Sequence, residues 1–206
     1  AKLLGLPVKG TMGHSLVMAF DTEQEAFTQF GKLFPDEGVF LVDTYDSIAG
    51  VKKAITIADE LKKEGLCFLG VRIDSGNLGE LSKKIRKILD KAGYHKVQIC
   101  ASNQLDEAPI AKLKKEQAAI SIWGVGTYLI TGSPEAALDG VDKLSCLHNQ
   151  TKQWTKKMKR SASATKTTLP GLLELQRYQQ DGIYVADLIY SATTAPQKDA
   201  SMYCYY

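Results

Sequence analysis

The chain has no long hydrophobic run, little net charge and few cysteines or histidines. None of its apolar stretches approaches the roughly 20 residues that a membrane-spanning helix needs. The net charge is +3 over 206 residues, which does not indicate a nucleic-acid-binding protein but suits a local basic site for small anions. We therefore expect a globular protein that binds neither a membrane nor nucleic acid.

The four cysteines, Cys67, Cys100, Cys146 and Cys204, are scattered and form no CxxC pair. This pattern favours free thiols in a reducing cytoplasm, with Cys67 and Cys100 as small core residues within strands. The three histidines show no spacing typical of a zinc site. The sequence therefore predicts neither a disulfide framework nor a zinc-ligand motif.

From residue 6 to about 147, short apolar runs alternate with amphipathic helical patterns. The predicted strands are Leu6–Lys9, Val39–Val42, Phe68–Ile73, Val97–Ala101 and Ile120–Trp123. Four helices are predicted. The first begins at Asp21, which forms a capping box with Gln24, and the second is capped by Ser47. The third begins at Leu78 and the fourth at Asp106-Glu107. The strands are apolar throughout rather than alternating, which is typical of strands buried on both faces. Repeated units of this kind predict a parallel α/β sheet, either open or closed into a barrel.

The pattern changes after about residue 148. Gln150–Lys166 is polar and contains Lys152, Lys156, Lys157, Lys159 and Arg160. A solvated loop is the favoured interpretation, and a phosphate-facing or nucleic-acid patch is the alternative. Further on, Leu172–Tyr178 and Ile183–Tyr190 flank Asp181-Gly182, which predicts a β-hairpin. An irregular tail is expected from Ser191.

Polar clusters follow each predicted strand at its carboxyl end. The clusters are Gly10–Ser15, Asp43–Asp46, Asp74–Asn77, Ser102-Asn103 and Gly124–Thr127. In parallel α/β proteins these ends share one rim, where ligands bind. The five clusters therefore predict one active site.

The Gly124–Thr127 segment predicts a phosphate-binding turn. Paired glycines let backbone N–H groups approach phosphate oxygens, and the Thr127 hydroxyl adds a donor. A Gly-x-Gly pattern alone is more often an ordinary tight turn. Its position after a late strand favours the functional interpretation.

Two aspartates at strand ends are candidates for sugar or metal chemistry. Asp74 and Asp43 could accept hydrogen bonds from ribose hydroxyls, stabilise a cationic centre, or hold a hydrated magnesium ion. Helix N-capping is the structural alternative for both. Function is favoured for Asp74, which lies beside Arg72, while the two interpretations are balanced for Asp43. Asp46 is predicted to be a cap or a supporting group.

Arg72 and His14 are the other candidates. Arg72 ends an otherwise apolar strand, so its guanidinium needs an anion at the rim or a buried partner such as Asp74. His14 lies between Gly13 and Ser15, small neighbours that leave its ring accessible. A lone histidine is more often structural, and the alternative is a general acid, base or nucleophile.

Taken in order, these clusters resemble the nicotinate phosphoribosyltransferase family. The matching segments are Pro7–Ser15, Phe34–Asp36, Leu41–Asp46, Val71–Gly76, Ala101–Glu107, Gly124–Thr127 and Lys166–Gly171. These segments extend over nearly the whole chain. Together they are specific for the family, although each motif alone is weak evidence for it. The chain departs from the family pattern at Gly13, where alanine is usual, and at Asn77, which often corresponds to aspartate.

The resemblance implies an irregular parallel α/β barrel of the type II phosphoribosyltransferase kind, flanked by a β-rich domain. Residues 1–148 would form part of the barrel. Residues 149–206, with the basic loop, the hairpin and the tail, would belong to the flanking domain. We expect the chain to be roughly the C-terminal half of such a protein, without its N-terminal domain.

The resemblance also implies an activity: nicotinate and phosphoribosyl pyrophosphate give nicotinate mononucleotide and pyrophosphate for NAD synthesis. Mg²⁺ would be the cofactor, and ATP the co-substrate hydrolysed through a phosphohistidine at His14. Asp74, with Asp43 assisting, would stabilise the cationic sugar, and Arg72 would orient the nicotinate or a phosphate. The implied binding residues are Thr11, Ser15, Tyr45, Ser75, Gly76, Ser102, Asn103, Gly124, Gly126 and Thr127, of which Gly124, Gly126 and Thr127 would hold the 5′-phosphate with Ser102 and Asn103 alongside.

The family further implies a cytoplasmic homodimer with shared active sites. Two alternatives stay open from the sequence. One is a relative on the same fold that uses nicotinamide or quinolinate, because Arg72 could face an amide or a carboxylate. The other is a truncated, non-catalytic chain that binds a nucleotide or serves as a subunit.

Overall fold

The computed structural model describes residues 2–5, 10–36, 38–131, 142–148, 153–159 and 167–193. These residues form two compact units, one of residues 1–142 and 159–167 and one of residues 143–158 and 168–206. Within the described ranges, no helix has the length and apolar character needed to span a membrane. The first predicted strand, Leu6–Lys9, lies outside these ranges.

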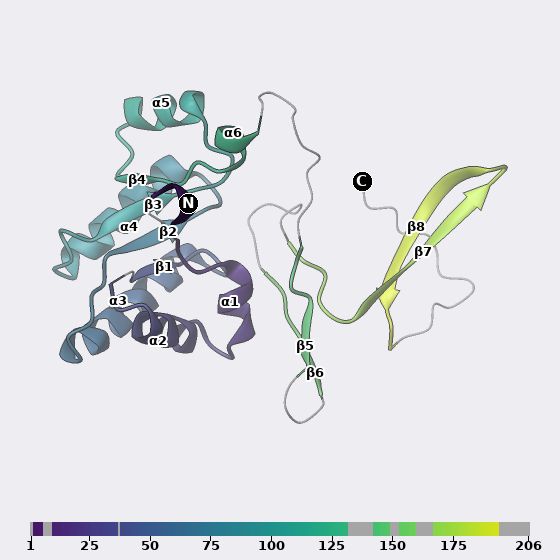
Figure 1. Ribbon diagram of the computed structural model, residues 1–206, viewed down its shortest axis with the longest axis horizontal. Coiled ribbons are helices and arrows are strands. Elements are labelled where there is room, and N and C mark those ends of the chain that lie inside the picture. Colours follow the sequence, from purple (N-terminus) through teal and green to yellow (C-terminus); the bar gives the residue numbers. More distant parts are fainter. Residues whose placement is uncertain are drawn as a thin grey trace. The chain divides into compact units, whose positions relative to one another are not determined.

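The first unit is built on a four-stranded parallel sheet. Its strands are β1 (Val39–Leu41), β2 (Gly70–Ile73), β3 (Gln98–Ala101) and β4 (Ile122–Trp123), and their order in the sheet equals their order in the chain. Its helices are η1 (Lys2–Leu4), α1 (His14–Ala19), α2 (Glu23–Leu33), α3 (Ser47–Lys63), α4 (Leu78–Lys91), α5 (Glu107–Lys115) and α6 (Thr127–Ile130), shown in Figure 1. The predicted parallel α/β sheet is therefore confirmed. Its closure into a barrel stays a prediction.

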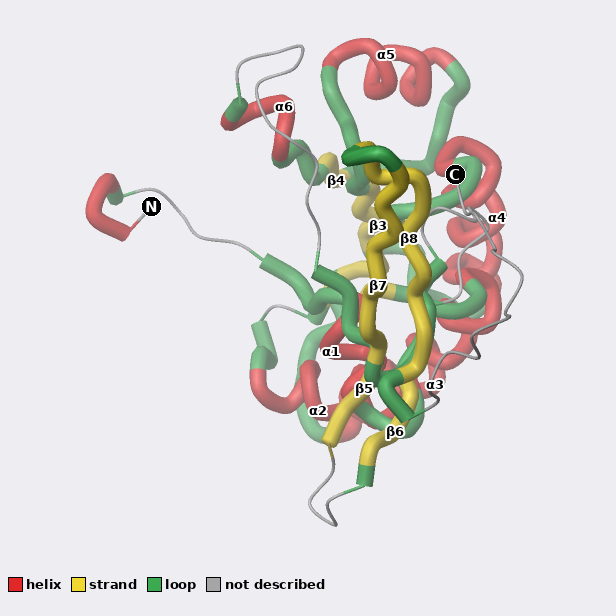
Figure 2. The backbone as a smooth tube through the Cα atoms, turned by 90° about the vertical axis from the view of Figure 1, so that its right-hand side faces the viewer, coloured by secondary structure: helices red, strands yellow, loops and turns green. Residues whose placement is uncertain are grey.

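The second unit contains two antiparallel pairs. They are β5 (Cys146–His148) with β6 (Trp154–Lys156), and β7 (Leu173–Gln180) with β8 (Ile183–Ser191). Figure 2 shows β7 and β8 side by side along their length. Asp181 and Gly182 both have positive φ, 51° and 80°, as a type I′ hairpin turn requires, so the predicted hairpin is confirmed.

Alternate residues of the parallel strands face two different environments. Phe40, Val71 and Ile99 are buried in the core. Their strand neighbours Val39, Arg72 and Cys100 instead line a pocket. Sequential strand order with right-handed crossovers brings the connecting helices to one face of a sheet, which leaves the opposite face to form this pocket.

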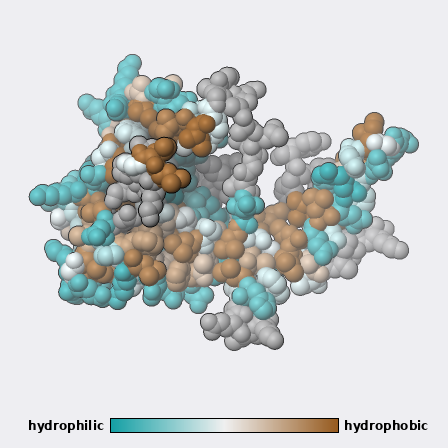
Figure 3. All heavy atoms as spheres, viewed as in Figure 1, coloured by the Kyte–Doolittle hydropathy of each residue, from teal (hydrophilic) through white to brown (hydrophobic). Residues whose placement is uncertain are grey.

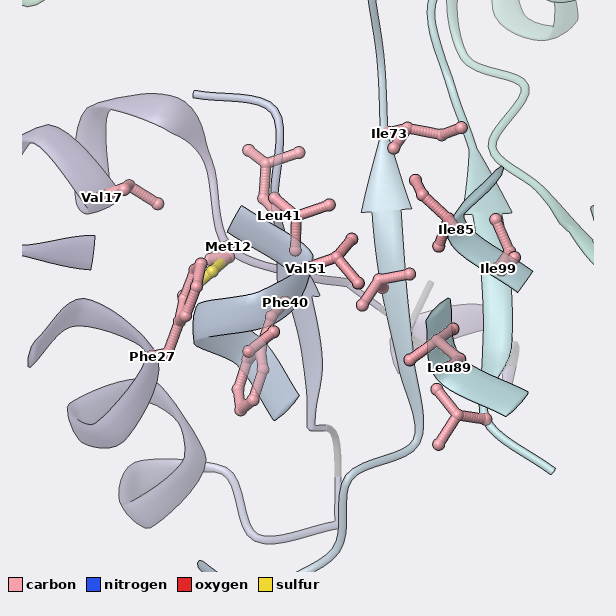
Figure 4. Close-up of a cluster of buried hydrophobic side chains, with 14 of the residues drawn as sticks. Met12, Val17, Phe27, Phe40, Leu41, Val51, Ile73, Ile85, Leu89 and Ile99 are labelled. Carbon is pink, nitrogen blue, oxygen red and sulfur yellow. The ribbon is translucent and has the colours of Figure 1, made fainter. Parts of the chain in front are cut away.

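The core lies between the sheet and its helices (Figure 4). Phe27 stacks on Phe40 with ring centroids 5.1 Å apart, and Phe40 stacks on Phe68 at 5.3 Å. Ile85 and Leu89 of α4 are completely buried in the same cluster. Full burial of each large apolar side chain contributes about 1.5–3 kcal/mol, so this cluster fixes the helices on the sheet.

One helix cap lies one residue away from its predicted position, and another confirms one of two predictions. α2 is capped by Thr22 rather than Asp21, because the Thr22 hydroxyl accepts a hydrogen bond from the Glu25 amide at 3.2 Å. α3 is capped by Asp46, a predicted cap, and not by Ser47, because the Asp46 carboxylate accepts a hydrogen bond from the Ala49 amide at 2.7 Å. Both caps follow the preference for an oxygen that reaches the third helical amide.

The prediction for Cys67 was wrong. Its side chain is exposed, and it precedes β2, which begins only at Gly70. Cys100, in β3, is buried as predicted. Other apolar side chains are also exposed, including Leu175 and Ile189 of the hairpin, and Figure 3 shows hydrophobic side chains among hydrophilic ones on the surface.

Gly50 lets α3 approach the end of β1, and an alanine there should destabilise the fold. An added Cβ would lie 2.1 Å from the Val42 carbonyl oxygen. We expect Gly50→Ala to lower the free energy of unfolding by about 2 kcal/mol or more, although alanine favours a helix interior by about 1 kcal/mol. Urea unfolding measures this. Gly10→Ala, whose Cβ would meet no atom within 4 Å, is the matched control, and equal midpoints for both variants would contradict the close approach.

Burial should separate the reactivity of two cysteines. Burial raises the pKa of the Cys100 thiol, and nearby Arg72 only partly opposes this shift. Less thiolate therefore forms at neutral pH, and the thiolate is the reactive species. We expect iodoacetamide to label Cys67 at least roughly tenfold faster than Cys100, measured by peptide mass spectrometry over time. Urea-denatured protein, in which the two rates should converge, is the control; similar rates in the native protein would refute the assigned burial.

Candidate functional site

The carboxyl ends of β1 and β2 bring two aspartates to one histidine. Asp43 and Asp74 follow these strands, and His14 begins α1. The His14 Nε2 atom lies 3.3 Å from Asp74 Oδ1 and 3.9 Å from Asp43 Oδ1. The predicted convergence of these three residues at one rim is therefore found in the structure.

Asp43 is held by one of its two carboxylate oxygens. Oδ2 accepts hydrogen bonds from the Asp74 backbone N–H at 2.8 Å and from the Ser75 hydroxyl at 2.6 Å. Oδ1 is buried and has no hydrogen-bond partner among the described residues. A buried carboxylate oxygen without a partner is costly, and this one is directed at His14. The arrangement therefore suits a ligand that binds at Oδ1.

Lys159 completes the cluster from a distant part of the chain. Its Nζ lies 2.7 Å from His14 Nε2 and 3.6 Å from Asp74 Oδ1. The sequence interpretation placed Lys159 in a solvated loop, which is wrong for this residue because its side chain is only 8% exposed. Nothing in the sequence distinguishes it from its neighbouring basic residues. Only the return of the chain to the first unit brings it here.

The cluster offers ligand atoms for a cation. One atom each from His14, Asp43 and Asp74 lies within 4.8 Å of the others. Mg²⁺ prefers oxygen ligands, so the two carboxylates fit it better than the imidazole does. The unpartnered Asp43 Oδ1 is the observation that supports a cation there.

A second part of the site lies on the open face of the sheet, in a pocket of about 780 Å³. Arg72 of β2 projects into it and donates a hydrogen bond from Nη1 to the Thr11 hydroxyl. Its Nε and the Ser102 hydroxyl are buried without partners among the described residues. The other lining residues are Gly10, Asp36, Val39, Phe68, Leu69, Lys96, Val97, Gln98, Cys100, Ile122, Trp123 and Gly124. The pocket therefore combines apolar walls with two hydrogen-bonding groups in need of a partner.

A smaller pocket of about 280 Å³ lies between the loops that follow β1 and β2. It is lined by Asp43, Tyr45, Ser75 and Gly76 together with the first residues of α3 and α4. Burial raises the pKa of the Tyr45 phenol, and the carboxylate of Glu23 adds to this shift. Tyr45 is therefore a neutral hydrogen-bonding group at neutral pH.

Four predicted binding residues line neither pocket. They are Ser15, Asn103, Gly126 and Thr127. Asn103 has a positive φ of 95°, which is uncommon for a residue other than glycine. Gly124 does line the large pocket, and an added Cβ would lie 3.1 Å from the Ser102 Cβ. The prediction that the Gly124–Thr127 turn holds a phosphate stays a prediction.

Residues 1–175 match the family described as the nicotinate phosphoribosyltransferase (NAPRTase) family. A nicotinate phosphoribosyltransferase from Bacillus subtilis is 39% identical over 209 residues, which cover 98% of this chain and 42% of that protein. One from Caenorhabditis elegans is 30% identical and covers 91% of this chain and 43% of that protein. The chain thus spans less than half the length of these relatives.

Solved structures agree in fold. The chain is similar to human nicotinic acid phosphoribosyltransferase, with a TM-score of 0.56 and 22% identity over 95% of this chain and 46% of that one. Nicotinate phosphoribosyltransferase from Porphyromonas gingivalis has a TM-score of 0.61 and is 22% identical. The similarity covers 80% of this chain and 44% of that one. The match to the family model and the identity to these relatives show that the chain belongs to the nicotinate phosphoribosyltransferase family.

Proposed function

We propose that this chain carries much of the active site of an enzyme that transfers a phosphoribosyl group to nicotinate. The substrates would be nicotinate and phosphoribosyl pyrophosphate, and the products nicotinate mononucleotide and pyrophosphate. The observation that carries the proposal is the cluster of His14, Asp43 and Asp74 at the end of β2, the strand whose Arg72 lines the apolar pocket. Because the chain spans less than half of its relatives, the activity is proposed for the whole protein.

The carboxylates match the charge that develops in this transfer. As pyrophosphate leaves C1 of the ribose, positive charge grows on the sugar, and a fixed carboxylate stabilises that charge. Asp74 is partly exposed at the rim, with 24% of its side chain accessible, and would face the ribose. Asp43, held by Ser75 and the Asp74 amide, would support it. The two carboxylates would hold Mg²⁺, which neutralises charge on the departing pyrophosphate.

The large pocket would hold the pyridine ring. Its walls are mostly apolar, and the buried Arg72 Nε and Ser102 hydroxyl have no partner in the described part of the chain. A carboxylate accepts hydrogen bonds from both groups, and pairing with a guanidinium adds a charge-assisted bond. A carboxamide carries no charge for Arg72 to pair with. This supports nicotinate over nicotinamide.

ATP would act through His14. Its Nε2 faces Lys159, Asp43 and Asp74, so a phosphate on the ring would add negative charge inside this cluster. New charge of this kind changes loop order and substrate affinity without joining the sugar transfer itself.

The remaining features of the family are proposed for the whole protein. The sequential sheet with one open face would be part of an irregular α/β barrel, closed by strands from outside this chain. Residues 149–206 would belong to a flanking β-rich domain. The protein would be a cytoplasmic homodimer with shared active sites, and Gly124, Gly126 and Thr127 would bind the 5′-phosphate.

The experiment that tests the activity is a substrate competition. The full-length protein is incubated with phosphoribosyl pyrophosphate, Mg²⁺, ATP and nicotinate, nicotinamide or quinolinate, and pyrophosphate release is measured. We expect turnover with nicotinate and little competition from the other two. Preference for nicotinamide or quinolinate would identify the alternative enzyme. Binding of nicotinate mononucleotide by calorimetry without turnover would identify the non-catalytic alternative.

Replacing His14 should separate ATP hydrolysis from transfer. We expect His14→Ala to abolish stimulation by ATP while leaving slow formation of nicotinate mononucleotide, because the carboxylates and the pocket remain. Initial rates with and without ATP measure this. His95→Ala is the matched control, since His95 is 71% exposed beside Asp90. If ATP stimulates His14→Ala as much as the unmodified protein, His14 does not couple ATP hydrolysis to the transfer.

A further inference from the structure

The second ring nitrogen of His14 has a partner of its own. His14 Nδ1 lies 3.1 Å from the Thr44 hydroxyl oxygen. Thr44 follows Asp43 after β1 and is completely buried. Among the residues that the structure describes, His14 is the side chain hydrogen-bonded to this hydroxyl. We propose that Thr44 is a positioning residue, whose hydroxyl accepts the Nδ1 proton of His14 and so fixes the orientation of the ring.

The other side of the ring decides which tautomer this is. Lys159 Nζ lies 2.7 Å from His14 Nε2, and an ammonium group donates hydrogen bonds but accepts none. Nε2 must therefore carry the lone pair, so the proton of the neutral ring is on Nδ1. The Nδ1–H group then donates to the Thr44 hydroxyl. The opposite tautomer would place an N–H against the ammonium and is excluded at this distance.

This arrangement keeps the reactive nitrogen in the site. The two hydrogen bonds are on opposite sides of the imidazole and fix its plane, with the Nε2 lone pair toward Lys159, whose Nζ also lies 3.6 Å from Asp74 Oδ1. A neutral imidazole reacts through its unprotonated nitrogen, which is Nε2 in this arrangement. The role of Thr44 in ATP coupling rests on the proposed function, whereas the tautomer itself does not.

The chain offers a well-matched set of variants. Thr44→Val keeps the shape of the side chain and removes the hydroxyl, and Thr44→Ser keeps the hydroxyl. Thr56→Val is the control, because the Thr56 hydroxyl donates its hydrogen bond to the Lys52 carbonyl on the exposed side of α3. The sequence has three histidines, so His95→Gln and His148→Gln assign the remaining signal to His14.

The test is a two-bond ¹H–¹⁵N correlation spectrum of ¹⁵N-histidine-labelled protein at about pH 8.5, where an ordinary imidazole is neutral. We expect His14 to carry its proton on Nδ1 in the unmodified protein, in Thr44→Ser and in Thr56→Val. In Thr44→Val the Nδ1 proton has lost its acceptor, and we expect it to exchange with water at least roughly tenfold faster than in Thr44→Ser. A proton on Nε2 in the unmodified protein, or equal exchange rates of the Nδ1 proton in Thr44→Val and Thr44→Ser, would overturn the proposal. If Thr44→Val does not fold, Thr44→Ala, which also lacks the hydroxyl, gives the same comparison.

Kinetics give a second readout. ATP-stimulated turnover should fall roughly tenfold in Thr44→Val, while Thr44→Ser recovers it and turnover without ATP stays unchanged. An equal loss with and without ATP would indicate a merely structural hydroxyl and would contradict the positioning role. If the unmodified protein shows no turnover at all, the proposed function fails, but the tautomer measurement stands on its own.

Discussion

The site depends on one buried carboxylate. Asp43 gives one oxygen to the Asp74 amide and the Ser75 hydroxyl, which ties the end of β1 to the end of β2. Its other oxygen, beside His14, has no hydrogen-bond partner within the described ranges. Burying such a group has a large desolvation cost, and the hydrogen bonds offset only part of it. The unsatisfied part of Asp43 is therefore where the ligand is expected.

The parallel sheet explains why the carboxylate, the histidine and the arginine are neighbours. Leu41 pairs with Arg72, so the two strands end at the same level and Asp43 and Asp74 follow at one rim. Alternation along β2 places Arg72 toward the pocket and Ile73 in the core. Thr11 then links Arg72 to the segment that leads into His14. One geometric rule thus supplies both the charged cluster and the apolar pocket.

The electrostatic balance of the cluster also follows from this geometry. Two carboxylates at a strand rim repel each other, and the Lys159 ammonium lies beside both Asp74 and His14. The ammonium lowers this repulsion and at the same time constrains the histidine. A phosphate or a pyrophosphate–magnesium complex entering the site would meet both signs of charge. This suits a reaction in which opposite charges develop on two parts of one substrate.

Local features were predictable because their causes are local. The positions of β1 to β4 followed from apolar runs, and the hairpin turn followed from Asp181 and Gly182. The cap of α2 was missed by one residue, and both Asp46 and Ser47 were predicted for α3, because Asp21, Thr22, Asp46 and Ser47 are all good capping types. Only the backbone geometry selects between neighbours of this kind. Cys67 was misassigned because an apolar neighbourhood does not show where strand pairing begins.

By itself, the sequence determined the alternation of β1 to β4 with α3 to α5, the β7–β8 hairpin, the polar residue types at each strand end and the family resemblance. Only the tertiary structure decided that Lys159 lies against His14, that Thr44 holds its other nitrogen, and that Arg72 and Ser102 share a pocket. Strand patterns depend on neighbours a few residues apart, whereas these contacts join segments separated by about 30 to 145 residues. Such contacts form because the assembled sheet brings the strand ends together. A local sequence pattern does not indicate which distant side chain lies beside a given residue.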